Sequence, residues 1–73
     1  MASKSYQFGL IQFQFSSSAR KWVFSNPTAN FTLVQSCGGI DAAQKVAKQV
    51  NGSFLRSGQI DGLCRAQIKK IIG

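Results

Sequence analysis

YQFGLIQFQFSSSARKWVF, residues 6–24, contains six of the eight aromatic residues of this chain and opens its most strand-like region. The apolar side chains stand at even positions up to Leu10 and at odd positions from Ile11, so the two-residue period of a β-strand shifts once. A β-bulge at this step, next to Gly9, would place all six apolar side chains of residues 6–15 on one face. We therefore predict one half-buried strand. Its wetter face carries Gln7, Gln12 and Gln14.

The sequence after this strand predicts a hairpin and a third strand. Residues 16–19 lack hydrophobic periodicity and indicate a connection, whereas residues 20–24 resume the β-branched and aromatic composition of a strand. Residues 25–30 favour a turn, because Pro27 fixes φ and the asparagines beside it tolerate left-handed geometry. Residues 31–34 then form the third strand.

A first amphipathic helix is predicted after the break at residues 37–39. Its buried face would carry Ile40, Ala43, Val46, Ala47 and Val50, which follow helical spacing. Asp41 in the first turn is favoured by the helix dipole. We expect the helix to end at Asn51 and Gly52, which form a typical C-cap pair, and residues 53–56 to form a short fourth strand.

A second amphipathic helix is predicted over residues 59–72. Its apolar stripe consists of Ile60, Leu63, Cys64, Ile68, Ile71 and Ile72. Asp61 lies near its positive end, and Gly62 makes the first turn its weakest part. The whole pattern predicts a single small α+β domain over residues 1–73: an antiparallel three-stranded sheet packed against two amphipathic helices, in the order β-β-β-α-(β)-α, with the short fourth strand in parentheses.

The charge of the chain points to an acidic partner. Nine Lys and Arg residues stand against two Asp, which gives a net charge of +7 and a sequence pI near 10.1. Such a charge on 73 residues repels itself in the folded state. Nucleic acid, an anionic membrane surface and an acidic protein are the candidate partners. The plainer alternative is that the positive charge only keeps a small protein soluble.

The cysteine and histidine counts limit metal chemistry. Cys37 and Cys64 are the only cysteines and the chain has no histidine, so we expect no zinc or other metal site and no cofactor. We favour two reduced, buried thiols. The alternative is a disulfide, which would close a loop of about 27 residues and add roughly 3 kcal/mol.

Neither a membrane span nor a targeting segment is evident. No apolar run approaches the roughly 18 residues that a membrane-spanning helix needs. Residues 1–5 lack the apolar core of a secretory signal. We expect an intracellular protein, cytoplasmic or organellar, although a signal that had already been removed would leave the same sequence.

The residue types disfavour catalysis. The chain has no His and no Glu, and its two carboxylates, Asp41 and Asp61, are each explained as partners of a helix N-terminus. Neither cysteine has a histidine to act as its base. The sequence CGGIDAAQK, residues 37–45, matches no nucleotide-binding pattern, although one nucleic-acid phosphate could bind at that helix N-terminus. We therefore expect a protein that is not an enzyme.

The basic residues converge if both helices pack on one face of the sheet. Arg65 and Lys69 are like-charged i, i+4 neighbours, and a bound anion would relieve their repulsion. Any single lysine is explained as part of a solvated face; for the whole set we favour nucleic-acid binding. The candidate nucleic-acid-binding residues are Arg20, Lys21, Trp22, Lys45, Lys48, Arg56, Arg65, Lys69 and Lys70.

Trp22 has two interpretations. An exposed indole beside Arg20 and Lys21 would stack on an unpaired base while its basic neighbours hold phosphates. Strand alternation instead places Trp22 on the same face as Phe24, which favours burial of both.

One segment resembles a known family. FTLVQ at residues 31–35, the predicted helix to Val50 and NGSFLRSGQI at residues 51–60 resemble the strand-helix-strand portion of a LAGLIDADG homing endonuclease half. The acidic helix that defines the family has no counterpart here, and neither Asp41 nor Asp61 matches its metal-binding position. The resemblance implies a sheet that lies against nucleic acid and does not cleave it.

The sequence therefore predicts a noncatalytic basic domain that binds DNA or RNA through phosphate contacts, with little sequence specificity. The alternative is a small assembly or adaptor module that docks on an acidic protein through an edge strand or an apolar patch. Binding to an anionic membrane ranks third, because the apolar stripes of both helices are needed for the core. A core this small also makes self-association a prediction to test.

Overall fold

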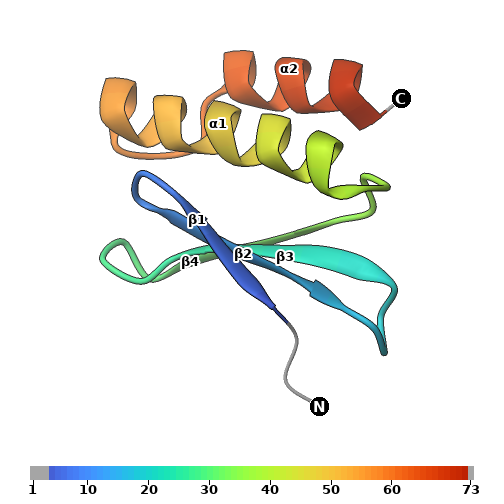
Figure 1. Cartoon of the computed structure of the whole chain (residues 1–73). Coiled ribbons are helices and arrows are strands. Elements are labelled where there is room, and N and C mark those ends of the chain that lie inside the picture. Colours follow the sequence, from blue (N-terminus) through green and yellow to red (C-terminus); the bar gives the residue numbers. More distant parts are fainter. Residues whose placement is uncertain (1–3, 73) are drawn as a thin grey trace.

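The computed structural model describes residues 4–72. Its elements are β1 (Ser5–Phe8), β2 (Ile11–Ser16), β3 (Lys21–Asn26), β4 (Phe31–Gln35), α1 (Ile40–Ser57) and α2 (Gly62–Ile72). The strands form one antiparallel sheet in the order β1-β2-β3-β4. Both helices cover the same face of this sheet (Figure 1). The predicted α+β class, an antiparallel sheet packed against two helices, is confirmed.

The region predicted as one bulged strand is a hairpin of two strands. Residues 9 and 10 form a two-residue turn, so Phe8 pairs with Ile11 and Tyr6 with Phe13. Paired residues of antiparallel strands share a face, and such a turn therefore moves the apolar positions from even to odd. The predicted bulge was wrong because a tight hairpin produces the same shift. Leu10 lies in the turn and is 44% exposed.

The β1–β2 turn is tied to α1 by Asn51. The Leu10 backbone N–H donates a hydrogen bond of 2.9 Å to Asn51 Oδ1. Gly9 adopts φ of +58°, and a Cβ atom there would lie 2.5 Å from the same Asn51 oxygen. Both the backbone conformation and the close approach of Asn51 therefore require glycine at this position.

The first helix extends past its predicted end, and the predicted strand at residues 53–56 is helical. The buried hydroxyl of Ser53 accepts a hydrogen bond from the Asp61 N–H at 3.0 Å, and the Phe54 ring packs on Phe31 with centroids 5.0 Å apart. These contacts offset the cost of about 1 kcal/mol that Gly52 imposes inside the helix. Gly58 ends the helix instead, with φ of 74° and an N–H bonded to the Phe54 carbonyl.

The second helix begins three residues later than predicted. Asp61 is its cap, because its Oδ1 accepts a hydrogen bond of 2.8 Å from the Cys64 N–H. Gly62 is consequently the first helical residue and not an internal one. The bond from the Cys64 N–H, followed by the hydrogen bonds from Arg56, lowers the pKa of Asp61.

The core lies between the inner face of the sheet and the helices. The predicted stripe of α1 is confirmed, since its alanines and valines are buried and Ile40 packs against them. Cys37 and Cys64 are buried free thiols, as favoured from the sequence, and burial raises the pKa of each. The buried apolar residues are Ile11, Phe13, Trp22, Phe24, Cys37, Ala43, Val46, Ala47, Val50, Cys64 and Ile68. None of the helices within residues 4–72 is long and apolar enough to cross a membrane.

Candidate nucleic-acid interface

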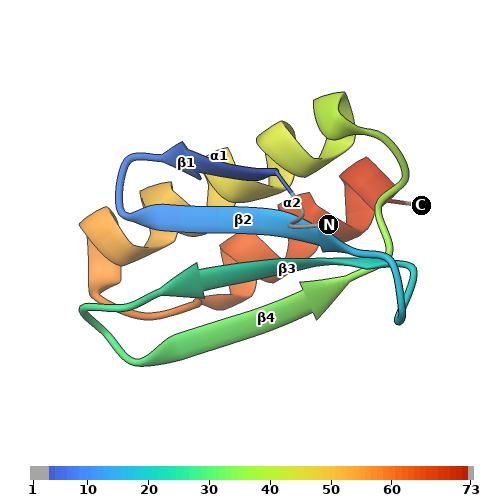
Figure 2. The same cartoon turned by 60° about the horizontal axis from the view of Figure 1, so that its bottom comes forward.

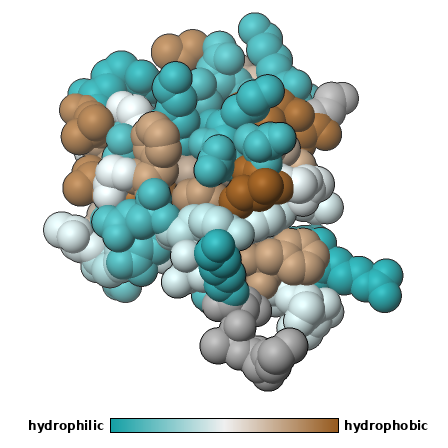
Figure 3. Space-filling view, in the orientation of Figure 1, coloured by the Kyte–Doolittle hydropathy of each residue, from teal (hydrophilic) through white to brown (hydrophobic). Residues whose placement is uncertain are grey.

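The structure divides the predicted basic residues between two places. Arg20 and Lys21 lie at the β2–β3 turn, which extends from the end of the sheet away from the helix layer (Figure 1). The others lie on the helices, and hydrophilic side chains gather over this layer at the top of Figure 3. All eight side chains are exposed. The helices carry Lys45, Lys48, Arg56, Arg65, Lys69 and Lys70.

The open face of the sheet is nearly uncharged. Figure 2 looks onto this face, with the helices behind it. Strand pairing aligns Gln7 with Gln12 and then Ser25, and a second row joins Gln14 to Val23. The predicted polar face is therefore confirmed, but Lys21 is its only cation among the described residues. Its remaining members are Ser5, Ser16, Thr32 and Val34.

Trp22 belongs to the core, which contradicts its place among the nucleic-acid contacts. Its side chain is 6% exposed, and its indole N–H donates a hydrogen bond of 2.8 Å to the Gly38 carbonyl. The ring also packs edge-on to Phe15, with centroids 5.5 Å apart. The alternative interpretation, in which Trp22 and Phe24 are both buried, is correct. This tryptophan holds the β4–α1 connection in place and does not present its ring to a base.

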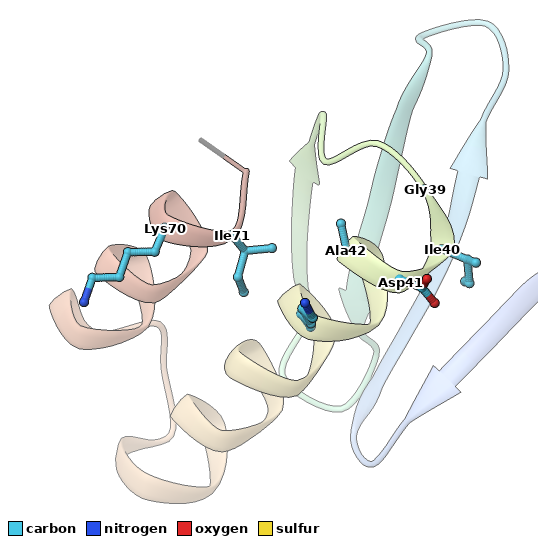
Figure 4. A pocket seen from close by; sticks show the side chains of 7 residues that line it. Gly39, Ile40, Asp41, Ala42, Lys70 and Ile71 are labelled. Carbon is cyan, nitrogen blue, oxygen red and sulfur yellow. The ribbon is translucent and has the colours of Figure 1, made fainter.

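Lys45 and Lys70 border one groove between the two helices. The groove has a volume of about 680 Å³ and lies at the start of α1 and the end of α2 (Figure 4). Within the described residues no side chain caps α1, so the positive end of the helix dipole faces this region. Asp41 and Lys70 lie on opposite sides of the groove. The lining residues are Gly39, Ile40, Asp41, Ala42, Lys45, Lys70 and Ile71.

A second depression continues the basic surface toward the edge of the sheet. It has a volume of about 420 Å³, and Lys45 and Lys48 line it together with Phe8 and Gln44. Lys45 therefore borders both depressions. We call Lys48, Lys45 and Lys70 the helix-layer row. Asp41 lines both depressions and is the one acidic side chain beside this row among the described residues.

The remaining helix cations have other surroundings. Arg56 forms the one ion pair found within residues 4–72, with its Nη2 2.8 Å from Asp61 Oδ2, and its Nε donates to the same oxygen at 3.0 Å. This pair engages Nε and Nη2 of the guanidinium. Arg65 and Lys69 line a separate groove between α2 and β4. The predicted set is thus split into a row, a paired arginine, a groove beside β4 and a hairpin tip.

No protein-family model matches this chain, and neither the curated proteins nor the solved structures contain a significant match to it. The resemblance to a LAGLIDADG half stays a sequence-based hypothesis. Its second strand would fall at residues 53–56, which are part of α1.

Proposed function

We propose that this protein is a noncatalytic nucleic-acid-binding domain that contacts phosphates through the helix-layer row. The observation that supports the proposal is the exposed sequence of Lys48, Lys45 and Lys70 along two adjoining depressions. None of the three forms an ion pair within the described residues. Their charge is therefore available to a polyanion.

The chemistry of the row favours phosphate contacts over base recognition. Lysine presents a compact, mobile charge on a flexible stem, whereas the planar fork of a guanidinium fixes the geometry of a bidentate contact. The uncapped start of α1 adds backbone N–H groups that favour an anion nearby. Asp41 opposes the anion. Binding with little sequence specificity follows from this composition.

The proposal predicts a defined salt dependence. Three neutralised phosphates correspond to a slope of log affinity against log salt of roughly −2 for a single strand and −3 for a duplex. Affinity should then fall about 20- to 40-fold between 50 and 200 mM salt. Fluorescence anisotropy with a labelled 20-nucleotide single strand and a 20-base-pair duplex measures both slopes. Salt-independent binding, or no binding at 50 mM salt, would contradict the proposal.

The decisive variant removes the row and has a matched control. The triple variant should bind nucleic acid more than tenfold more weakly at 100 mM salt; it combines Lys45→Gln, Lys48→Gln and Lys70→Gln. The control changes Lys4, Arg20 and Lys21 to glutamine, which removes the same charge from exposed positions outside the helix layer. It should weaken binding less than threefold. Equal losses in the two variants would assign the binding to net charge alone.

A further inference from the structure

The β4 strand has an open edge that the rest of the described chain leaves unpaired. Within residues 4–72 it pairs with β3 alone, so the backbone N–H and C=O groups of alternate residues point away from the sheet. Edge strands usually carry a charge, a proline or a bulge that prevents pairing, and Phe31–Gln35, FTLVQ, has no charge and no proline. The other edge, β1, is shorter and follows Lys4.

An apolar groove runs beside this open edge. Helix α2 packs mainly against α1, and a space of about 150 Å³ remains between α2 and the inner face of β4. A cavity of this size can take one aliphatic or aromatic side chain. Leu33 contributes from β4, whereas Ile68 and Ile72 contribute from α2. The full lining is Leu33, Gln35, Ile60, Arg65, Ile68, Lys69 and Ile72.

The charge around the groove is positive. Arg65 and Lys69 lie one helical turn apart on α2, and both line the groove. Among the described residues that line it, none is acidic. Like charges at this spacing repel each other, so an acidic side chain between them would be favoured. The neighbouring Arg56 is already bound to Asp61 and does not compete for such a group.

We propose that β4 binds an extended, acidic segment of a protein partner as a fifth strand of the sheet. The backbone of the segment pairs with the open edge, an apolar side chain enters the groove, and acidic side chains two positions away on the same face reach Arg65 and Lys69. This inference is independent of the nucleic-acid proposal, because it uses neither Lys45, Lys48 nor Lys70. It defines the partner by an alternating acidic and apolar pattern.

A synthetic probe tests the inference on the full chain after nuclease treatment. The probe is a fluorescein-labelled peptide, Ser-Glu-Thr-Ile-Thr-Glu-Ser, whose Ile and two Glu side chains share one face of a strand. Anisotropy at 150 mM salt should show saturable binding. Two control peptides should bind at least tenfold more weakly: one rearranged to Ser-Glu-Ile-Thr-Glu-Thr-Ser, which breaks the alternation, and one with N-methyl groups on alternate backbone amides.

Two charge-reversal variants separate this groove from the helix-layer row. Arg65→Glu with Lys69→Glu should weaken peptide binding more than tenfold, whereas Lys45→Glu with Lys48→Glu should change it less than threefold. All four positions are exposed, so both proteins should keep their fold, which circular dichroism checks. Equal losses in the two variants would overturn the assignment to the groove.

The remaining outcomes also decide the inference. Equal binding of the N-methylated and unmodified peptides would exclude strand pairing. Light scattering shows whether the chain forms a dimer. If the peptide fails to dissociate that dimer, and the Arg65→Glu, Lys69→Glu variant still forms it, a second copy of this chain occupies the β4 edge. Displacement of the peptide by a 20-nucleotide strand, but not by excess unlabelled peptide, would make the groove a nucleic-acid site. Each of these results overturns the proposal.

Discussion

The helix layer and the open face of the sheet are both exposed and polar, yet they carry different kinds of polar group. The outer side of α1 and α2 bears Lys45, Lys48 and Lys70, whereas the sheet presents mainly glutamine, serine and threonine. Amide and hydroxyl side chains form hydrogen bonds with water as charged side chains do, so both faces are compatible with solvent. A concentration of positive charge such as that on the helix layer favours a polyanion from a distance, which a neutral polar face does not. Exposure and polarity alone therefore do not locate a binding surface; the distribution of charge does.

The largest expected effect comes from Gly9, in the turn that Asn51 ties to the helix layer. Gly9→Ala should lower the free energy of unfolding by about 2–3 kcal/mol, because alanine is strained at positive φ and its Cβ would displace Asn51 from its hydrogen bond with Leu10. Thermal denaturation measures the loss. Gly52→Ala is the control: it lies inside α1 with open space around it, so it should raise stability by about 0.5–1 kcal/mol. A harmless Gly9→Ala would contradict the described turn.

The next effect compares the two faces at equal charge. Two double variants each lower the net charge by two: Lys45→Gln with Lys48→Gln on the helix layer, and Gln12→Glu with Gln14→Glu on the open face. The first pair should weaken nucleic-acid binding about tenfold and make the salt slope shallower by roughly 1.4 for a single strand and 1.8 for a duplex. The second pair should weaken it less than twofold, since the open face takes no part. If the two pairs weaken binding equally, the difference between the faces has no functional meaning.

A smaller effect concerns Arg56, a helix cation that binds Asp61. The pKa of Asp61 is lowered from its ordinary value of 3.8, so its contribution to stability is present above that pH and is lost as the pH falls through the lower, folded-state pKa. The melting temperature should therefore drop on acidification from about pH 5 to pH 2, and less steeply in Asp61→Asn. Arg56→Gln should also lower the melting temperature. Its affinity for nucleic acid should change less than twofold, and a large loss would return Arg56 to the binding surface.

The smallest effect has the opposite sign. Asp41 lines both depressions of the helix-layer row, where its negative charge would oppose a phosphate. Asp41→Asn should therefore strengthen binding about two- to threefold at 50 mM salt, in line with the modest energies of exposed charges. The gain should disappear at high salt, because screening shortens the range of the repulsion. Unchanged affinity at low salt would mean that the ligand does not pass the start of α1.

Local sequence patterns correctly predicted an element where the competing structures, a helix and a strand, require different hydrophobic periods. The buried stripe of α1 follows one helical period, and no strand could produce it. The shift at Leu10 and Ile11 was different, since a bulge and a hairpin give the same alternation. Asn51 and Gly52 have the composition of a helix end, yet Asn51 bonds to a turn far away in sequence and Ser53 is buried. Contacts of this kind are not encoded in local sequence.

The candidate site shows the same division. The spacing of Lys45 and Lys48 places them on one side of a helix, and this is readable from the sequence. The approach of Lys70 to Lys45 depends on how the helices pack, and the pairing of Arg56 with Asp61 depends on where α1 ends. Strand alternation already favoured burial of Trp22, and its 6% exposure and the hydrogen bond from its indole to the Gly38 carbonyl confirm that burial.

A map of where a nucleic acid touches the chain would show whether the helix layer is the binding surface. Titration of the isotope-labelled protein with a 20-nucleotide strand, followed in the amide proton-nitrogen NMR spectrum, should shift the signals of residues 41–48 and of the last turn of α2. The signals of Gln12, Gln14 and Ser25 on the open face should stay in place. Shifts concentrated on those three residues, with the helix layer unaffected, would contradict the account.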